Sequence, residues 1–205
     1  GHEINNPVFT IVARVELLLR GETDPQRRHW LSIIGGQAER IRDMIGDAML
    51  FGRPPEEHPE SLDLAAEIKT VLDRLAERVD RQGCTLVFHS RGDVSIWADR
   101  VQLSIVISSL VSNSLNALAD GGPISIDARM TEDESARPTS VISVTDHGSG
   151  LNETDLRHLF DPFYSGRQAG RGLGFGLPKC WRIVSNHQGQ IEVSSAPGEA
   201  TTFTV

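Results

Sequence analysis

Residues 52–60 read Gly-Arg-Pro-Pro-Glu-Glu-His-Pro-Glu, and this stretch decides how the chain is organised. It holds three prolines and three acidic residues and shows no apolar periodicity, which is typical of a linker. The stretch predicts a division into a helical region at residues 1–52, a linker at 53–60 and one further domain at 61–205.

The region before the linker predicts two amphipathic helices joined by a short turn. Apolar residues recur at helical spacing on both sides of residues 21–25, which read Gly-Glu-Thr-Asp-Pro. Asp24 is a good N-cap, and Pro25 suits the first position of the second helix. One helical hairpin cannot cover its own apolar stripes. They pack either against a second copy, as a four-helix bundle, or against the rest of the same chain.

Helices and strands mix without regular alternation after the linker. Helical patterns cover 64–81, 99–119, 155–160 and 173–188. Strand patterns cover 84–89, 94–97, 124–130, 141–145, 190–195 and 201–205. This order predicts an α+β fold, an α/β sandwich in which one mixed sheet carries helices over one face.

The composition fits a soluble globular chain. The 205 residues are 39% hydrophobic and 23% charged, with a formal net charge of -8. An acidic balance argues against a protein that mainly binds nucleic acid, because such proteins usually have a basic excess. Lys69 and Lys179 are the only lysines, so we expect phosphate contacts to come from arginines or backbone amides.

Two further features concern the compartment. Cys84 and Cys180 are too few for a disulfide framework, which fits a reducing environment. No apolar run approaches the ~18 residues of a membrane span. The chain begins at Gly1 rather than a methionine and reads as a fragment. We therefore expect this part to be cytoplasmic, and any membrane anchor of the full-length protein to lie in N-terminal regions outside it.

The first chemical motif is His2-Glu3-Ile4-Asn5-Asn6-Pro7. His2 and Asn6 are four residues apart and share one helical face, and Glu3 lies beside His2. A neutral imidazole is a good nucleophile near neutral pH, and a neighbouring carboxylate can fix its tautomer and accept its proton. A histidine near a terminus is more often simply solvated, so this motif alone is weak.

The second motif, Asp146-His147-Gly148-Ser149-Gly150, directly follows the predicted strand 141–145. An acid at a strand end puts a carboxylate at the mouth of a pocket, and the two glycines let the backbone approach a ligand. A carboxylate can accept from an exocyclic amine such as that of adenine. A simple turn is the competing interpretation, since Asp and Gly are common turn residues.

The third motif is a glycine run, Gly170-Arg171-Gly172-Leu173-Gly174-Phe175-Gly176-Leu177, which opens a predicted helix. Such a run offers free N–H groups and the positive end of the helix dipole, which suit phosphates. It lacks the Gly-Lys-Ser/Thr ending of a P-loop and the spacing of a dinucleotide fingerprint. By itself it favours phosphate binding and tight helix packing about equally.

The fourth motif is the pair Asn113 and Asn116, one turn apart on the predicted helix 99–119. A side-chain carbonyl on a helix beside polyphosphate is a plausible Mg²⁺ ligand, because this hard ion prefers oxygen and keeps several waters. A buried or solvated asparagine is the commoner case for either residue taken alone.

Together these motifs resemble the sensor histidine kinases of bacterial two-component signalling. They occur in the order His-Glu-x-x-Asn-Pro, Asn113, Asp-x-Gly-x-Gly, Phe160-Asp161-Pro162-Phe163-Tyr164 and the glycine run. Residues 1–52 resemble the dimerisation and histidine phosphotransfer hairpin. The rest resembles the ATP-binding catalytic domain shared with gyrase, a heat-shock chaperone and mismatch-repair ATPases.

The resemblance implies an activity, cofactors and partners. The activity is ATP-dependent autophosphorylation of His2, followed by phosphoryl transfer to an aspartate of a response regulator. The implied cofactors are ATP and Mg²⁺, and the implied partners are a response regulator receiver domain and a second copy bound through residues 2–52.

The resemblance also implies a role for each matching residue. His2 resembles the phospho-acceptor, Glu3 its activating acid and Asn6 the residue that orients water in members with phosphatase activity. Asn113 resembles the Mg²⁺ ligand, and Asp146 resembles the adenine-binding carboxylate. The other implied nucleotide contacts are Asn116, Gly148, Gly150, Phe160, Phe163, Arg167, Gly170, Arg171, Gly172, Leu173 and Gly174.

Departures from the family pattern keep other functions open. Ser109 stands where relatives often have a second asparagine, and Asn116 where they often have a basic residue. These departures motivate the alternative of a nucleotide-binding pseudokinase scaffold. Asn6 is compatible with a protein that acts mainly as a response-regulator phosphatase. The His2 motif and the hairpin argue against a bare ATPase or a serine kinase with the same ATP-binding domain.

The resemblance implies that the nucleophile and the nucleotide are held by different domains. His2 lies before the linker and the implied ATP contacts lie after it, so the catalytic domain must swing to reach His2. We therefore expect the geometry of the linker, rather than chemistry at the pocket, to gate activity.

Overall fold

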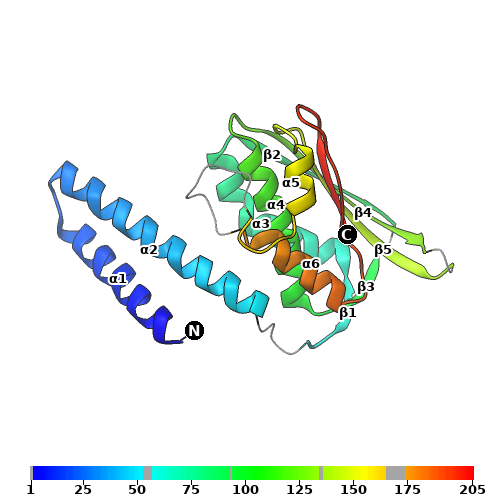
Figure 1. The fold of residues 1–205 in the computed structure, drawn as a ribbon, viewed down its shortest axis with the longest axis horizontal. Coiled ribbons are helices and arrows are strands. Elements are labelled where there is room, and N and C mark those ends of the chain that lie inside the picture. Colours follow the sequence, from blue (N-terminus) through cyan, green and yellow to red (C-terminus); the bar gives the residue numbers. More distant parts are fainter. Residues whose placement is uncertain (1, 53–56, 93, 134–135, 165–173) are drawn as a thin grey trace.

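A helical hairpin projects from a domain built on a sheet (Figure 1). The computed structural model describes residues 2–52, 57–92, 94–133, 136–164 and 174–205, without the side chains of 2–5, 43, 47–48 and 50–52. The helices are α1 (His2–Gly21), α2 (Pro25–Gly52), α3 (Leu64–Arg81), α4 (Arg100–Ala117), α5 (Glu153–His158) and α6 (Gly176–Asn186). The strands are β1 (Glu60–Asp63), β2 (Cys84–Arg91), β3 (Ser95–Ala98), β4 (Gly122–Glu132), β5 (Pro138–Asp146), β6 (Glu192–Ser194) and β7 (Thr201–Thr204).

Side chains at both helix ends hold the turn between α1 and α2. Oδ1 of Asp24 accepts the N–H groups of Gln26 and Arg27, at 2.8 and 2.9 Å, and so caps α2 as the sequence predicts. Arg28 donates to the carbonyl of Leu19 at 3.0 Å and satisfies an acceptor at the end of α1. The two helices therefore run antiparallel to each other (Figure 1).

The hairpin buries only a small apolar cluster of its own. Val8, Val12 and Ala38 are buried there, with Ile45 packed against them. Other large apolar side chains of both helices are exposed: Phe9, Ile11, Leu17, Leu18, Trp30, Ile33, Ile34, Ile41 and Met49. The possibility that both stripes pack against the rest of the same chain is therefore wrong for these residues.

The main sheet has the strand order β2-β4-β5-β7-β6 and is mixed, as predicted. β2 runs parallel to β4, and the other neighbours are antiparallel. Burial alternates along β4, as expected for a strand with one face against the core. Ile124, Ile126 and Ala128 are buried, whereas Ser125 and Asp127 between them are only half-buried. One face of the sheet is therefore apolar and the other polar.

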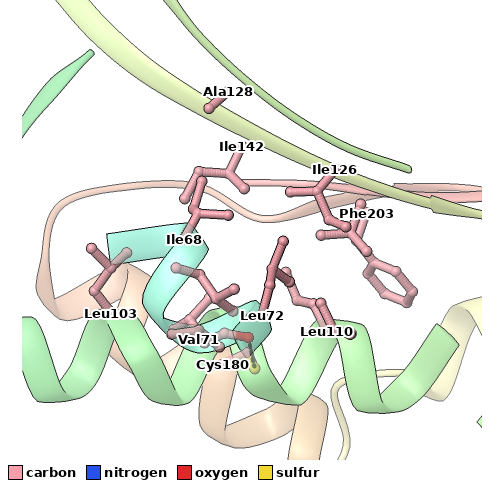
Figure 2. Packing of buried hydrophobic residues seen from close by; sticks show 14 of the residues in the cluster. Ile68, Val71, Leu72, Leu103, Leu110, Ile126, Ala128, Ile142, Cys180 and Phe203 are labelled. Atoms are coloured by element: carbon pink, nitrogen blue, oxygen red, sulfur yellow. Dashed lines mark hydrogen bonds between the residues drawn. The ribbon is translucent and has the colours of Figure 1, made fainter. Parts of the chain in front are cut away.

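Helices α3, α4 and α6 cover the apolar face and close a single core. In Figure 2, side chains of α3 and α4 point toward those of β4, β5 and β7 across the interior. The labelled residues of this core are Ile68, Val71, Leu72, Leu103, Leu110, Ile126, Ala128, Ile142, Cys180 and Phe203. Helices on one face of a mixed sheet are the architecture that the sequence predicts.

The strands depart from the prediction in two respects. β3, the predicted strand 94–97, lies outside the main sheet and pairs antiparallel with β1. The sequence did not indicate β1, because four residues are too few to show a period of two. β4 and β5 also run further than predicted, with Glu132 opposite Pro138, because backbone pairing continues past the last apolar residue.

Two observations bear on the expectations about compartment. Cys84 and Cys180 are both buried and form no disulfide. Within the described ranges, no helix combines the length and the apolar character that crossing a bilayer requires.

Candidate active site

Asp146 ends β5 on the helix-covered face of the main sheet. It follows Ile142 and Val144 at strand spacing, so its side chain turns inward with theirs and is only 1% exposed. Oδ1 accepts the N–H of Gly148 at 3.0 Å. Oδ2 is buried and has no hydrogen-bond partner among the described residues. Because such an oxygen is costly to bury, the site fits a ligand that donates a hydrogen bond to it.

The turn after Asp146 packs closely against two other segments. A Cβ on Gly148 would lie 2.8 Å from the Cβ of Ala117 in α4 and 3.0 Å from Oδ1 of Asp146. Gly150 has a φ of 68°, and a Cβ there would overlap the carbonyl oxygen of Ala196. Glycine is therefore required at both predicted positions, and it brings the backbone beside the buried carboxylate.

The hairpin formed by β6 and β7 hydrogen-bonds to the same turn. Gly198 donates its N–H to the carbonyl of Ser149 at 2.8 Å. The hydroxyl of Ser195 accepts the N–H of Leu151 at 3.0 Å and lies 2.8 Å from the hydroxyl of Thr201. The sequence did not predict these supporting residues, because a local pattern does not show which side-chain hydroxyl will hydrogen-bond to which distant backbone group.

α4 brings Asn113 to the same end of the domain as Asp146. The last residue of α4, Ala117, abuts Gly148, and Asn113 lies one turn earlier on that helix. Asn113 is half-buried. Its side-chain amide is therefore placed on the helix that borders the turn, where the oxygen suits Mg²⁺ and the N–H₂ group suits a phosphate.

Asn116 makes a contact that the sequence did not indicate. Arg78 of α3 donates to Oδ1 of Asn116 and to the hydroxyl of Ser112, both at 3.2 Å. Asn116 thus turns its carbonyl toward α3, and Arg78 brings a positive charge to the end of α4. Local periodicity could not reveal this residue, because Arg78 lies within a helix whose exposed positions are generally charged.

The predicted aromatic residues lie in different surroundings. Phe163 contacts Phe175 edge-on, with ring centroids 4.8 Å apart. Phe163 is 71% exposed and has a φ of 68°, which is uncommon for a bulky residue. Phe160 is half-buried at the edge of the main core. Phe175 occupies the N-cap position of α6 and contacts Phe163, although the sequence motifs did not single it out as a nucleotide contact.

Tyr164 and Asp155 fix the segment that follows α5. The hydroxyl of Tyr164 donates to Oδ1 of Asp155 at 2.7 Å. This hydrogen bond and partial burial raise the pKa of Tyr164 above its usual range. Gly174, another predicted contact, has a φ of 69°, and a Cβ there would overlap the carbonyl of Tyr164. Tyr164 and Gly174 therefore lie side by side near the start of α6.

Several predicted site residues lie outside the described residues. They are Arg167, Gly170, Arg171, Gly172, Leu173 and the side chains of His2 and Glu3. The backbone places His2, Glu3 and Asn6 in the first two turns of α1, and the Asn6 side chain is exposed. The predicted nucleophile and Asp146 thus lie on separate parts of the molecule (Figure 1).

The described residues offer no metal site made of protein ligands alone. No group of three or more His, Cys, Asp or Glu side chains in these ranges could hold a metal ion. A single amide oxygen, such as that of Asn113, fits Mg²⁺ in a different way, because this ion keeps several waters and is usually bound together with substrate phosphates.

A cavity of about 500 Å³ lies elsewhere in the sheet domain. Its walls come from β3, the start of β5 and the C-terminal half of α6, and include Trp97, Ile142 and His187. Among the described residues, none of the predicted nucleotide contacts lines it. This cavity therefore lies apart from the described residues that the sequence predicts to contact a nucleotide.

Comparison with known proteins places both parts of the chain in one class. Residues 1–57 match the family described as His Kinase A (phospho-acceptor) domain, and residues 98–205 match the Histidine kinase-, DNA gyrase B-, and HSP90-like ATPase. The chain is 29% identical over 205 residues to the signal transduction histidine-protein kinase AtoS of Escherichia coli (strain K12). The match covers all of this chain and 33% of AtoS, so the chain spans about a third of this relative.

Solved structures show the same fold. Full-length ShkA in complex with AMPPNP has a TM-score of 0.80 at 18% identity, over 99% of this chain and 43% of ShkA. Histidine kinase ThkA in complex with response regulator protein TrrA has a TM-score of 0.71 at 20% identity, over 100% of this chain and 58% of ThkA. With the two family matches, the chain belongs to the histidine kinases, as a phospho-acceptor domain followed by an ATPase domain.

Proposed function

We propose that this chain is the kinase core of a two-component sensor. It transfers the γ-phosphoryl group of ATP to its own His2 and then to an aspartate of a response regulator. The observation that carries this proposal is the buried Asp146 in the matched ATPase region. Its Oδ2, at the end of a strand, has no hydrogen-bond donor among the residues that the structure describes. The exocyclic amine of adenine supplies that donor.

The nucleotide is held by groups around this strand end. The adenine amine donates to Oδ2 of Asp146 beside the closely packed Gly148 and Gly150. The phosphates extend toward α4 and the N-terminal end of α6, where free N–H groups and the helix dipole favour anions. Mg²⁺, held by the amide oxygen of Asn113 with water and phosphate oxygens, would neutralise phosphate charge.

Transfer to His2 is an in-line displacement at phosphorus. A ring nitrogen of His2 forms the new bond to the γ-phosphorus, and the bond from that phosphorus to the bridging oxygen breaks, which releases ADP. Glu3 accepts the proton that the other ring nitrogen loses. Such transfers depend mainly on positioning and charge neutralisation. The catalytic domain must therefore be brought to α1, which is separate from it in Figure 1.

The hairpin functions as half of a four-helix bundle in a homodimer through residues 2–52. The support is the set of large apolar side chains that α1 and α2 leave exposed, including Leu18, Trp30 and Ile34. A second copy covers this surface and gives the core that one hairpin lacks. ThkA, a structural neighbour, was solved with a response regulator, which supports the receiver domain as the partner of the phosphorylated hairpin.

Radiolabelled ATP tests the phosphotransfer. We expect His2→Ala to abolish labelling of the chain, and acid to remove the label from the unmodified protein because phosphohistidine is acid-labile. The matched control is His29→Ala, which removes an exposed histidine from the same hairpin and should label normally. Label that survives acid, or that persists in His2→Ala, would show that another residue is phosphorylated and would overturn the proposal.

Nucleotide titration tests the role of Asp146. Asp146→Asn replaces the charged acceptor, so we expect ATP affinity to fall roughly ten- to a hundredfold. Asp127→Asn makes the same change on the opposite, polar face of the sheet and should leave affinity unchanged. Saturable binding of Mg-ATP with no labelling would instead support the pseudokinase scaffold.

Asn6 favours a second activity of the same hairpin. It is exposed one turn after His2, where a water for hydrolysis of a phosphorylated receiver aspartate could be oriented. If the chain is also a phosphatase, Asn6→Ala will slow the loss of label from a phosphorylated response regulator and leave labelling of His2 intact. Equal loss of label with and without Asn6 would exclude this role.

A further inference from the structure

Asp99, between β3 and α4, hydrogen-bonds three separate segments of the sheet domain. Oδ1 accepts the N–H of Gln102 at 2.9 Å and caps α4. Oδ2 accepts the N–H of His58 at 2.9 Å, directly after the stretch 53–57. The N–H of Asp99 donates to Nε2 of His187 at 3.1 Å. One nearly buried residue thus joins the end of the linker to α4 and to α6.

His187 holds Asp99 from the far side. Its Nδ1 lies 2.9 Å from the carbonyl of Ile183, one turn earlier, and therefore carries the proton of a neutral ring. Nε2 is then the acceptor that the N–H of Asp99 needs. Both ring nitrogens are used, so the backbone at Asp99 is fixed by α6 whether or not the linker is bound.

The sequence explains why a side chain, rather than the backbone of β3, accepts the hydrogen bond from His58. β1 pairs with β3 from Glu60 opposite Ala98, and one further step along that register would place Pro59 opposite Asp99. Proline has no N–H and ends the backbone ladder. The next available donor is the N–H of His58, and the carboxylate of Asp99 is long enough to reach it.

Arg100 binds the same segment through its side chain. Its Nε donates to Oε1 of Glu60, the first residue of β1, at 3.0 Å, and its guanidinium also pairs with Glu67 of α3. The hydrogen bond that Arg100 donates to Glu60 is the main reason that the pKa of Arg100 is raised. Two adjacent residues therefore hold the chain on both sides of Pro59, one through the backbone and one through a carboxylate.

From these contacts we propose that Asp99 and Arg100 are positioning residues that clamp the domain end of the linker at His58–Glu60. The clamp makes this end a fixed pivot on α4, the helix that carries Asn113. It excludes His58–Glu60 from the swing of the catalytic domain and so sets how readily the nucleotide reaches His2. This role rests on the proposed autophosphorylation and specifies its regulation.

The size of the effect follows from linker length. Release of His58 and Pro59 lengthens the connection between Gly52 and the first held residue from five residues to seven. The effective concentration of a tethered partner falls with about the −3/2 power of tether length, which gives a loss of roughly twofold, and loss of direction adds to it. We therefore expect a two- to fivefold slower autophosphorylation at saturating ATP, with an unchanged KM for ATP, because no clamp contact involves a predicted nucleotide contact.

Asp99→Ser isolates the clamp from the helix cap. Serine keeps an oxygen for the N–H of Gln102 but has no second oxygen for His58. Asp63→Ser is the matched control, because Asp63 caps α3 by accepting the N–H of Ala66 at 3.1 Å and is a cap of the same kind. Glu60→Gln is a second test, since it loosens Arg100 through an exposed residue and does not disturb the buried carboxylate.

The experiment measures two quantities on the whole chain. Hydrogen exchange reports the His58 amide, which we expect to exchange faster in Asp99→Ser and at the wild-type rate in Asp63→Ser. Labelling from ATP reports autophosphorylation, which should slow in Asp99→Ser and Glu60→Gln with KM unchanged. If the amide rate does not change, the clamp does not exist. An unchanged or faster labelling rate, or a rise in KM that explains the slowing, overturns the positioning role.

Failure of the proposed function has a different signature. A wild-type chain that acquires no acid-labile label refutes autophosphorylation, and with it the positioning role. The exchange of the His58 amide then still decides whether the clamp is present.

Discussion

The hairpin and the sheet domain are both amphipathic, but only one of them completes its own core. In the sheet domain, α3, α4 and α6 cover the apolar face and leave residues such as Ile107, Leu110 and Phe203 with no exposure at all. In the hairpin, Trp30 and Leu18 are more than half exposed. The difference shows that the sheet domain completes a core by itself, whereas the hairpin leaves an apolar surface that a second copy covers in the proposed homodimer.

The largest effect should come from the same truncation made in each region. Phe203→Ala removes the largest fully buried side chain, so we expect the sheet domain to lose about 3–5 kcal/mol of unfolding free energy. Phe9→Ala in α1 removes a ring that is 68% exposed and should leave that unfolding transition unchanged. Urea denaturation of both variants checks this. Equal losses would mean that the two regions share one core.

A charge on the exposed stripe should break the hairpin's association and leave the sheet domain intact. Ile34→Glu places a carboxylate on the apolar surface, so we expect the dimer dissociation constant to rise roughly ten- to a hundredfold. Ser32→Glu adds the same charge at a position that helical geometry turns about 160° away. Sedimentation equilibrium compares the two. If the dimer dissociation constant does not change in Ile34→Glu, the interface lies elsewhere.

Loss of the Asp99 clamp should weaken the junction between the regions by an intermediate amount. Burial opposes ionisation of Asp99, but hydrogen bonds from backbone N–H groups, including those of Gln102 and His58, outweigh it and lower its pKa. A lowered folded pKa gives stability that is present above the unfolded pKa and is lost as pH falls through the folded value.

Asp99→Ser should therefore cost about 1–2 kcal/mol at pH 7 and progressively less as the pH falls below the unfolded pKa of about 4, because the unfolded carboxylate then takes up a proton before the folded one does. Urea denaturation of the variant and the wild type at pH 7 and pH 3 measures the difference. A deficit of the same size at both pH values would show that the charge of Asp99 contributes nothing.

The smallest effect concerns the contact between α3 and α4. Arg78→Gln removes the bonds to Ser112 and Asn116, for which we expect a loss of about 0.5–1 kcal/mol in the sheet domain. Arg74→Gln, one turn earlier and exposed, should cost less than that. Thermal unfolding resolves the two variants. Identical midpoints would mean that Arg78 does not hold these helices together.

Patterns with a short period were readable from the sequence. The two helices of the hairpin, the cap at Asp24 and the main helices of the sheet domain follow from apolar spacing and capping residues, and the structure confirms them. Asp146 was readable for the same reason, because an acid at a strand end before two glycines is a local signal. The roles of Asp146 and the two glycines in nucleotide binding stay predictions.

Contacts between distant segments were not readable. β1 is only four residues long and exists because β3 pairs with it. Arg78 looks like any solvated helix residue until Asn116 is placed beside it. The hydrogen bond from His58 to Asp99 spans a sequence separation of 41, and no local pattern encodes it.

By itself the sequence determined the order of all elements except β1, the family motifs and the inward face of the predicted helices and strands, because these depend on periods of two and 3.6 residues. Tertiary structure alone decided that Oδ2 of Asp146 is buried with no donor among the described residues, that large apolar side chains of the hairpin stay exposed and that the linker is held at His58. These outcomes depend on which residues from distant parts of the sequence contact one another, because burial and hydrogen bonding between them arise only from those contacts.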